Sequence, residues 1–407
     1  MKRFMAVMMA AFLVAGFSMQ ASAGSINRDI KIGGEYELDY VYEDTDFLDV
    51  DDDDGSYVEH ELDLEFEIDL GDGFIAGGSM EYVDSTLGDD DNAVGEDNEI
   101  EVEEAYVEMT FDEATVTAGK FGFAFPSSIC GNPVLDDEGT GVDADFGPVS
   151  AGWLRTGDFD ELTDDKKDVF YVIGNMESGN ITVKPYVAYE HQGEDADNDP
   201  LVDDEEFDTY WLGAALEMKA GNFGLLSEAI YGNRSYSDDY PAEDQAGFLF
   251  DIKAGFDLGN MTPFAISIYS TGQDDDDEDN TLPVVQTPDE DRDDCDDYEP
   301  FNIVEDQLRD GIFLIGAGID DIKFAPRFEH ELVLAYMTGT GDEDAVSTAS
   351  LNNEENDAFE IDFNSTYELK KGLADLYLDL GYAEADLEGV DDDEAATYFE
   401  FGLEIEF

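Results

Sequence analysis

The sequence predicts an all-β protein, a transmembrane antiparallel β-barrel of about 18 strands. Three observations lead to this fold class. Segments of about ten residues alternate between apolar and charged side chains, the connections between them have two distinct lengths, and the N-terminus carries an export signal. No later stretch approaches the roughly 20 uncharged apolar residues that a spanning helix needs. An exported chain that crosses a membrane must then cross it as strands.

The N-terminus has the three parts of a secretory signal peptide. Lys2 and Arg3 are followed by an uncharged apolar core, residues 4–17, and a small-residue cleavage box that ends at Ala23. The alternative is an uncleaved membrane helix, but the apolar core is short for one. We therefore expect a cleaved signal peptide and one barrel domain, residues 1–23 and 24–407, and a location in the cell outer membrane.

The charge balance excludes one class of partner. The chain has 407 residues, with 105 Asp and Glu against 18 Lys and Arg, for a formal charge of −87. A nucleic-acid-binding protein needs a basic surface, and this chain has no material for one. Hydrophobic residues nevertheless make up 42% of the chain and aromatic residues 12%. This is too much for a disordered acidic chain, so these residues must be buried in a core or in lipid.

The alternation is clearest in residues 61–70, which read ELDLEFEIDL. At 180° per residue the apolar side chains share one face and the acids the other, whereas a helix would spread the acids around its axis. Residues 30–40, 359–364 and 399–407 follow the same pattern. In a transmembrane barrel the polar face lines the lumen. The expected pore-lining acids are Glu35, Glu37, Asp39, Glu61, Asp63, Glu65, Glu67, Asp69, Glu360, Asp362, Glu400 and Glu404.

A soluble β-sandwich also alternates and is the competing interpretation. The ends of the alternating segments are rich in Tyr and Phe, for example Tyr36, Tyr40, Tyr106 and Tyr189, as the aromatic girdles of a membrane barrel require. This favours the barrel.

The connections favour a bacterial outer-membrane barrel, with short periplasmic turns and long extracellular loops. Counting strands between them gives eighteen, or sixteen if residues 311–327 are irregular. The short turns lie near residues 72, 112, 179, 221 and 260, and the long loops are 43–56, 84–98, 122–141, 157–167, 192–206, 234–244, 273–310, 339–357 and 384–395.

Residues 104–108 and 117–121 resemble the paired fourth and fifth strands of the general porins of Gram-negative bacteria. In that family the loop after strand five folds inward and narrows the pore. The resemblance therefore implies an inward-folding constriction loop at about 122–141, whose acids are Asp136, Asp137 and Glu138. It also implies that the terminal Phe407 is an insertion signal. The candidates for the family's opposing basic cluster are few, namely Lys120, Arg155, Arg234 and Arg327.

Residues 336–340 and 358–383 resemble, more specifically, the homotrimeric porins of sulfate-reducing bacteria, which are of the Desulfovibrio type. This resemblance implies a homotrimer, for which the sequence itself carries no interface pattern.

Carboxylates on the wall of a water-filled lumen concentrate cations and exclude anions. We therefore expect a passive, cation-preferring diffusion channel for ions and small hydrophilic solutes, with outer-membrane lipid around it. The alternatives are a substrate-specific outer-membrane channel and a surface barrel that binds cations without transporting them. Saturable block of the conductance by one solute would indicate the former, and an electrically silent protein the latter.

The runs of Asp in the predicted loops are read as solvated loops, with calcium capture as the alternative. Asp52, Asp54 and Glu61 fit later positions of a calcium-loop pattern, but Val50 occupies the position of the first ligand. No cofactor is otherwise expected.

Cys130 and Cys295 lie in two predicted loops of an exported chain, so a disulfide between them and two separate thiols are both open. Catalysis is not expected, because none of the three histidines, His60, His191 and His330, has the spacing of a nucleophile or metal site. Trp153 and Trp211 are expected at the membrane-facing or interfacial surface.

Overall fold

The structure is a computed structural model. It describes residues 30–44, 55–81, 102–111, 114–127, 129, 132–156, 167–192, 206–237, 244–273, 280–285, 311–342, 351–387 and 394–407. Among these residues no helix is long and apolar enough to cross a membrane. The predicted signal peptide, Cys130, Cys295, Asp52 and Asp54 lie outside the described residues.

The described chain consists of strands joined by turns and loops. The strands are β1 (Ile30–Asp44), β2 (Gly55–Gly71), β3 (Phe74–Glu81), β4 (Ala105–Phe111), β5 (Ala114–Ala124), β6 (Asp136–Asp145), β7 (Val149–Thr156), β8 (Lys167–Gly174), β9 (Met176–Ser178), β10 (Ile181–Gln192), β11 (Phe207–Ala220), β12 (Phe223–Tyr236), β13 (Gln245–Phe256), β14 (Thr262–Ser270), β15 (Ile312–Asp320), β16 (Phe328–Gly339), β17 (Asp357–Lys370), β18 (Ala374–Asp386) and β19 (Glu394–Glu406).

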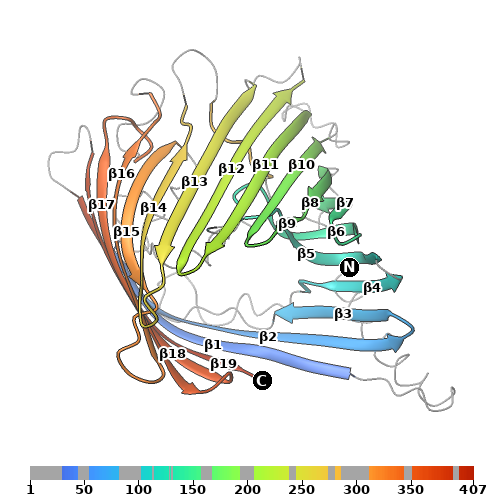
Figure 1. The fold of residues 1–407 in the computed structure, drawn as a ribbon, viewed down its shortest axis with the longest axis horizontal. Helices are drawn as coiled ribbons and strands as arrows, with labels where there is room; N and C mark the ends of the chain where they lie inside the picture. The colour runs from blue at the N-terminus through green and yellow to red at the C-terminus, as the bar shows by residue number, and fades with distance from the viewer. Residues whose placement is uncertain are drawn as a thin grey trace.

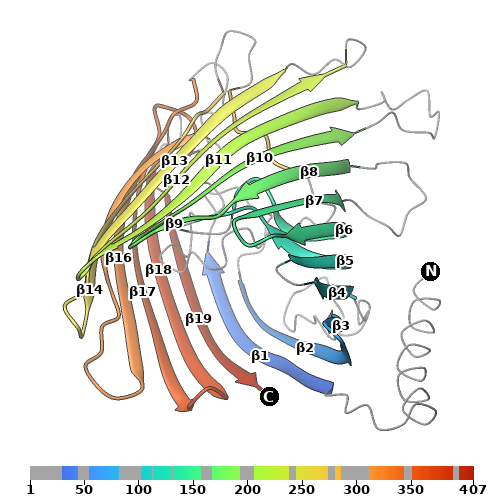
Figure 2. The same cartoon turned by 45° about the vertical axis from the view of Figure 1, so that its right-hand side comes forward.

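The strands form one closed antiparallel barrel (Figure 1). Each strand pairs with the next in sequence, and β1 pairs with both β2 and β19, which closes the sheet. Figure 2 shows β1 and β19 side by side at this closure. β8 and β9 both pair with β10 and are interrupted at Asn175, so together they count as one strand of the wall. The predicted number of eighteen is confirmed, and the regular strand β15 removes the alternative of sixteen.

The two faces of the wall differ as the alternation predicts. In β17, Phe359 and Ile361 are exposed by 43% and 36%, whereas Glu360 and Asp362 between them are buried. Exposed large hydrophobic residues recur on the same alternate positions from β1 to β19. Because side chains in a barrel point alternately outward and inward, the apolar set forms the outer face and the acidic set the inner face.

One rim of the barrel carries short turns and the other long connections. The turn between β2 and β3 is Gly71-Asp72-Gly73, in which all three residues have positive φ, a conformation that glycine adopts at no steric cost. At the opposite rim the strand ends are separated by longer stretches of sequence, for example from Glu81 of β3 to Ala105 of β4 and from Ser270 of β14 to Ile312 of β15. We call these two rims the short-turn end and the long-loop end.

The inner face carries two hydrophobic clusters on which loop residues pack. One joins the inner faces of β5, β7, β8 and β10–β13 to Phe125, Val134, Leu282 and Val285. The other joins the inner faces of β14–β19 to Leu351, Leu387 and Ile129. The lumen is therefore partly filled by segments from the long-loop end. Trp211 belongs to the first cluster and is 2% exposed, so the prediction that it faces the membrane is wrong.

Candidate site in the lumen

An acidic wall runs along the inner faces of β19, β1 and β2. The register places Glu37 directly opposite Glu404 on one side and Glu61 on the other, and it pairs Glu35 with Asp63. Opposite residues of neighbouring strands have their side chains about 5 Å apart, so strict alternation stacks these acids into rows. The local cause is the sequence itself, in which every second residue is acidic over 35–39 and 61–69, and in which Glu400, Glu404 and Glu406 share one face of β19.

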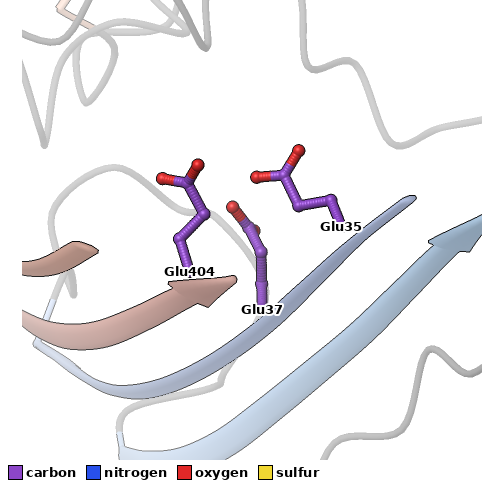
Figure 3. A group of neighbouring side chains, drawn as sticks. All are labelled: Glu35, Glu37 and Glu404. Atoms are coloured by element: carbon purple, nitrogen blue, oxygen red, sulfur yellow. The ribbon is translucent and has the colours of Figure 1, made fainter. Parts of the chain in front are cut away.

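Three of these acids converge. The carboxylates of Glu35, Glu37 and Glu404 lie within 4.8 Å of one another, and their side chains point toward one another above β1 and β19 (Figure 3). Carboxylate oxygens are the ligands that hard cations such as Ca²⁺ prefer. These three residues have the ligand type that could hold a cation. We call them the Glu35 cluster.

Tyrosines order the neighbouring part of the wall. The Tyr377 hydroxyl on β18 donates a hydrogen bond to Asp39 on β1, across the strand β19 that lies between them. The two side chains meet above Gly402, where any Cβ would collide with both. On β19 itself, the Tyr398 hydroxyl donates to Glu400. The tyrosines therefore hold two of the predicted acids in fixed positions.

The predicted pore-lining acids all lie on the inner face, but they differ in exposure. Glu65 and Asp69 on β2 are exposed, while Glu67 accepts a hydrogen bond of 2.6 Å from Lys31. Glu35, Glu37, Glu61, Asp63, Glu400 and Glu404 are half-buried, and Asp39, Glu360 and Asp362 are buried. Apart from Asp39, the predicted acids of β1, β2 and β19 thus remain at least partly accessible, whereas those of β17 do not.

The connection after β5 does enter the barrel, but its bounds differ from the prediction. β5 continues to Ala124 and β6 begins at Asp136, so the loop is 125–135 instead of 122–141. Asp136, Asp137 and Glu138 belong to β6 and pair with β5, so their expected place in the loop is wrong. Backbone pairing to β5 extends through this acidic stretch, where composition alone suggested a loop.

The loop 125–135 is held at Glu228, on the inner face of β12. Ser127 Oγ and Asn132 Nδ2 each donate a hydrogen bond of 2.9 Å to the Glu228 carboxylate. The strands β6, β7, β8, β10 and β11 separate β5 from β12. Six strand spacings amount to roughly 29 Å along the wall, so the loop reaches Glu228 through the lumen. Phe125 stacks on Tyr186 of β10 at 4.8 Å between ring centroids and anchors its near end.

Of the four basic candidates, the structure places Arg234 alone on the inner face. Arg155 lies on the outer face, where it donates to Asp168 beside Trp153. Lys120 alternates with the inward-facing Phe121 and donates to the Val102 carbonyl. Arg327 lies in the turn between β15 and β16 and donates to the Leu369 carbonyl. These three therefore cannot oppose the acidic wall, because strand parity or turn position directs them elsewhere.

No lysine was predicted on the inner face of the far side of the barrel, and Lys184 and Lys253 are two described examples. Lys184 of β10 alternates with Tyr186 and is exposed, and Lys253 of β13 lies 3.4 Å from Asp320. In an eighteen-stranded wall β10 is almost diametrically opposite β1. Strand parity, counted from the buried Tyr186, would have found Lys184.

The position of Glu61 does not agree with the calcium-loop pattern. This residue lies within β2, opposite Glu37, and not in a loop.

No protein-family model matches the chain, and no curated protein matches it. Several solved structures do match the chain. OccD3 (OpdP) of Pseudomonas aeruginosa aligns with a TM-score of 0.61 at 10% identity over 93% of this chain and 91% of that chain. OccK10 (OpdN) of the same organism aligns with a TM-score of 0.60 at 12% identity, over 93% and 99%. OpdL, also of Pseudomonas aeruginosa, aligns with a TM-score of 0.60 at 10% identity, over 94% and 99%.

At these identities the similarity establishes the fold. The closer likeness to porins of sulfate-reducing bacteria stays a prediction.

Proposed function

We propose that this protein is an outer-membrane channel, selective for its solutes, that lets small hydrophilic cations diffuse through the barrel. One observation carries the proposal: a closed barrel has an apolar outer face and, on β19, β1 and β2, rows of accessible inner-face acids. The outer face suits lipid, which requires that all backbone groups pair within the barrel.

The selectivity for solutes has two supports. The loop 125–135 and the two inner clusters take up part of the lumen, which restricts the size of what can pass. The structures of similar fold are outer-membrane porins of the substrate-specific OprD/Occ type. A substrate-specific channel therefore accounts for these findings better than a general porin does.

The preference for cations follows from the acidic wall. Fixed carboxylates beside a low-dielectric wall create a negative potential that concentrates cations. At physiological salt the screening length is roughly 8 Å, so the effect is strong only where the passage is narrow. The Glu35 cluster is where accessible acids crowd most closely in the described residues, and we place the cation preference there.

The test is the reversal potential of the purified protein in a planar bilayer under a salt gradient. We expect a cation-selective sign, reduced by the triple change Glu35→Gln, Glu37→Gln and Glu404→Gln. The matched control is Glu384→Gln, an exposed acid on the outer face of β18. An anion-selective sign, or the same selectivity in the triple variant and in the wild type, refutes the proposed role of the wall. Chemical cross-linking in detergent tests the predicted homotrimer separately.

A further inference from the structure

A second segment from the long-loop end, residues 280–285, lies inside the barrel against β11, β12 and β13. The Trp211 indole donates a hydrogen bond of 2.6 Å to the Pro283 carbonyl, and the Gln245 amide donates one of 2.6 Å to Thr281 Oγ1. Each bond starts from a side chain of the inner face and ends on the segment. The segment is therefore docked on the wall and not merely adjacent to it.

The wall is shaped to receive this segment. A Cβ at Gly232 of β12 would lie 2.8 Å from the Pro283 ring, and a Cβ at Gly247 of β13 would overlap the backbone nitrogen of Leu282. Both glycines have ordinary strand conformations, so close approach, not backbone freedom, is what requires them here. Leu282 and Val285 complete the first hydrophobic cluster.

Arg234 is the charged anchor of this contact. Its guanidinium donates to the Val284 carbonyl at 2.6 Å, to Thr209 Oγ1 at 2.9 Å and to Glu190 at 3.1 Å. It also lies 4.2 Å from the centroid of the Phe207 ring. Arg234 and Glu190 are 4% and 0% exposed at their side chains. A buried guanidinium needs this many acceptors, so removing it would leave several of them without a donor.

The segment 280–285 and the loop 125–135 support each other. The Val285 amide donates a hydrogen bond of 2.9 Å to the Val134 carbonyl, and both residues belong to the first hydrophobic cluster. Together they pack on inner-face residues of β5, β7, β8 and β10–β13. On β19, β1 and β2 the predicted inner-face acids other than Asp39 remain at least partly accessible.

We infer that Arg234 is a positioning residue that holds residues 280–285 in the lumen, and that this segment sets the largest solute able to pass along the acidic wall. The inference rests on the proposed function. The charge of Arg234 does not face the passage, because Glu190 and two oxygen acceptors occupy its guanidinium. Its effect is therefore on the width of the passage, transmitted through the segment.

The first experiment compares Arg234→Met, Arg234→Lys and the control Arg155→Met by swelling of proteoliposomes in neutral sugars of increasing size. Neutral sugars report width without charge. We expect both Arg234 variants to admit larger sugars than the wild type, since lysine keeps the charge but lacks the fork that meets three acceptors. Arg155→Met removes an outer-face arginine and should leave the size limit unchanged. An unchanged size limit in Arg234→Met, or a wild-type limit in Arg234→Lys, would overturn the inference.

The second experiment displaces the segment without touching the ion pair. Gly247→Val places side-chain atoms where Leu282 lies, whereas the control Gly224→Val on β12 adds them to open space. A third variant replaces residues 280–285 with alternating Gly and Ser and leaves the wall intact, which covers the case that a wall variant does not fold. We expect Gly247→Val and the replaced segment to raise the size limit and Gly224→Val not to.

A wild-type protein impermeable to every sugar and electrically silent would count against the proposed function. A permeable wild type with the same size limit in all displaced variants would count against the inference alone.

Discussion

Glu228 is a single side chain on the wall that holds the loop 125–135, which starts from a distant strand, in position. Its two carboxylate oxygens accept separate hydrogen bonds from Asn132 and Ser127, while its own amide donates to Asp251 at 2.7 Å. The residue is 1% exposed. Hydrogen bonds to a charged acceptor in such a setting each contribute on the order of 1.5–3 kcal/mol.

We expect Glu228→Ala to release the loop 125–135 from the wall without unfolding the barrel. The change leaves the Ser127 hydroxyl and the Asn132 amide without their shared acceptor in a buried place. Limited proteolysis in detergent should then cut within this loop faster than in the wild type, with Glu384→Ala as the outer-face control. Equal cleavage rates in the two variants would show that the loop is held by the hydrophobic cluster instead.

At this scale the sequence predicted the face of each acid but not the partners. Parity within β1, β2, β17 and β19 follows from the alternation, so the inner face could be read directly. Arg155 and Arg234 look alike in sequence, yet one lies outside with Asp168 and the other inside with Glu190. Their strands must be bounded before parity can be counted, and the partners come from strands that sequence alone does not place side by side.

At the scale of the element, each strand directs one row of side chains to the outer, lipid-facing side and the other row to the lumen. In β17 the outward Ile361 and the inward Thr366 are both exposed, one on the apolar outer face and one on the polar inner face. A charged side chain destabilises the folded barrel far more on the outer face than on the inner face, because hydrocarbon does not solvate it.

We expect Ile361→Lys to lower the stability of the folded barrel in lipid by about 2–4 kcal/mol, the cost of a lysine near the bilayer midplane. Thr366→Lys on the inner face of the same strand should change it much less. Equilibrium unfolding in guanidinium from lipid vesicles measures both. A larger loss for Thr366→Lys than for Ile361→Lys would reverse the assignment of the two faces.

The turn between β15 and β16 offers a prediction outside the spanning strands. A hydrogen bond of 2.8 Å from the Lys323 ammonium lowers the pKa of the Asp321 carboxyl below its usual value. The charged form is thus favoured in the folded state. The stabilisation is present above the unfolded pKa of about 3.9 and is lost as the pH falls through the lower folded value.

Asp321→Asn should therefore cost stability at pH 7, by at most about 1 kcal/mol for an exposed pair, and nothing in strong acid. Asparagine suits the left-handed conformation of this position, where φ is 57°, so backbone strain does not confuse the comparison. The measurement is the guanidinium midpoint of both proteins at each pH. A difference that persists undiminished in strong acid would mean that the ion pair is not its cause.

Strand existence could be predicted better than strand ends. Residues 117–121, which resemble a fifth strand in sequence, do lie within β5, and the short and long connections alternate as expected. β6 was hidden because its sequence, DDEGTGVDAD, has the composition of a loop. Its glycines serve packing: a Cβ at Gly141 would overlap the Trp153 carbonyl of β7. Such close contacts exist only once the neighbouring strands are in register.

At the scale of the whole molecule, the lumen is asymmetric. Two segments from the long-loop end pack on inner-face residues of β5, β7, β8 and β10–β13, while β19, β1 and β2 keep accessible acids. Of the two segments that fill the lumen, residues 280–285 are the one that the sequence did not predict, since they belong to a stretch with the composition of a solvated loop. Its contacts with Trp211 and Arg234 join residues about 50 to 70 positions apart.

The most direct test of an acid-lined passage along β1 is a thiol scan of this strand during current recording. Cys130 and Cys295 are first changed to serine. Single cysteines replace Glu35, Tyr36, Glu37 and Leu38 in turn, and each is treated with a charged, membrane-impermeant thiol reagent. We predict that the current changes on modification at positions 35 and 37 and stays constant at 36 and 38. Equal responses at all four positions, or a response confined to 36 and 38, would contradict an acid-lined passage along this strand.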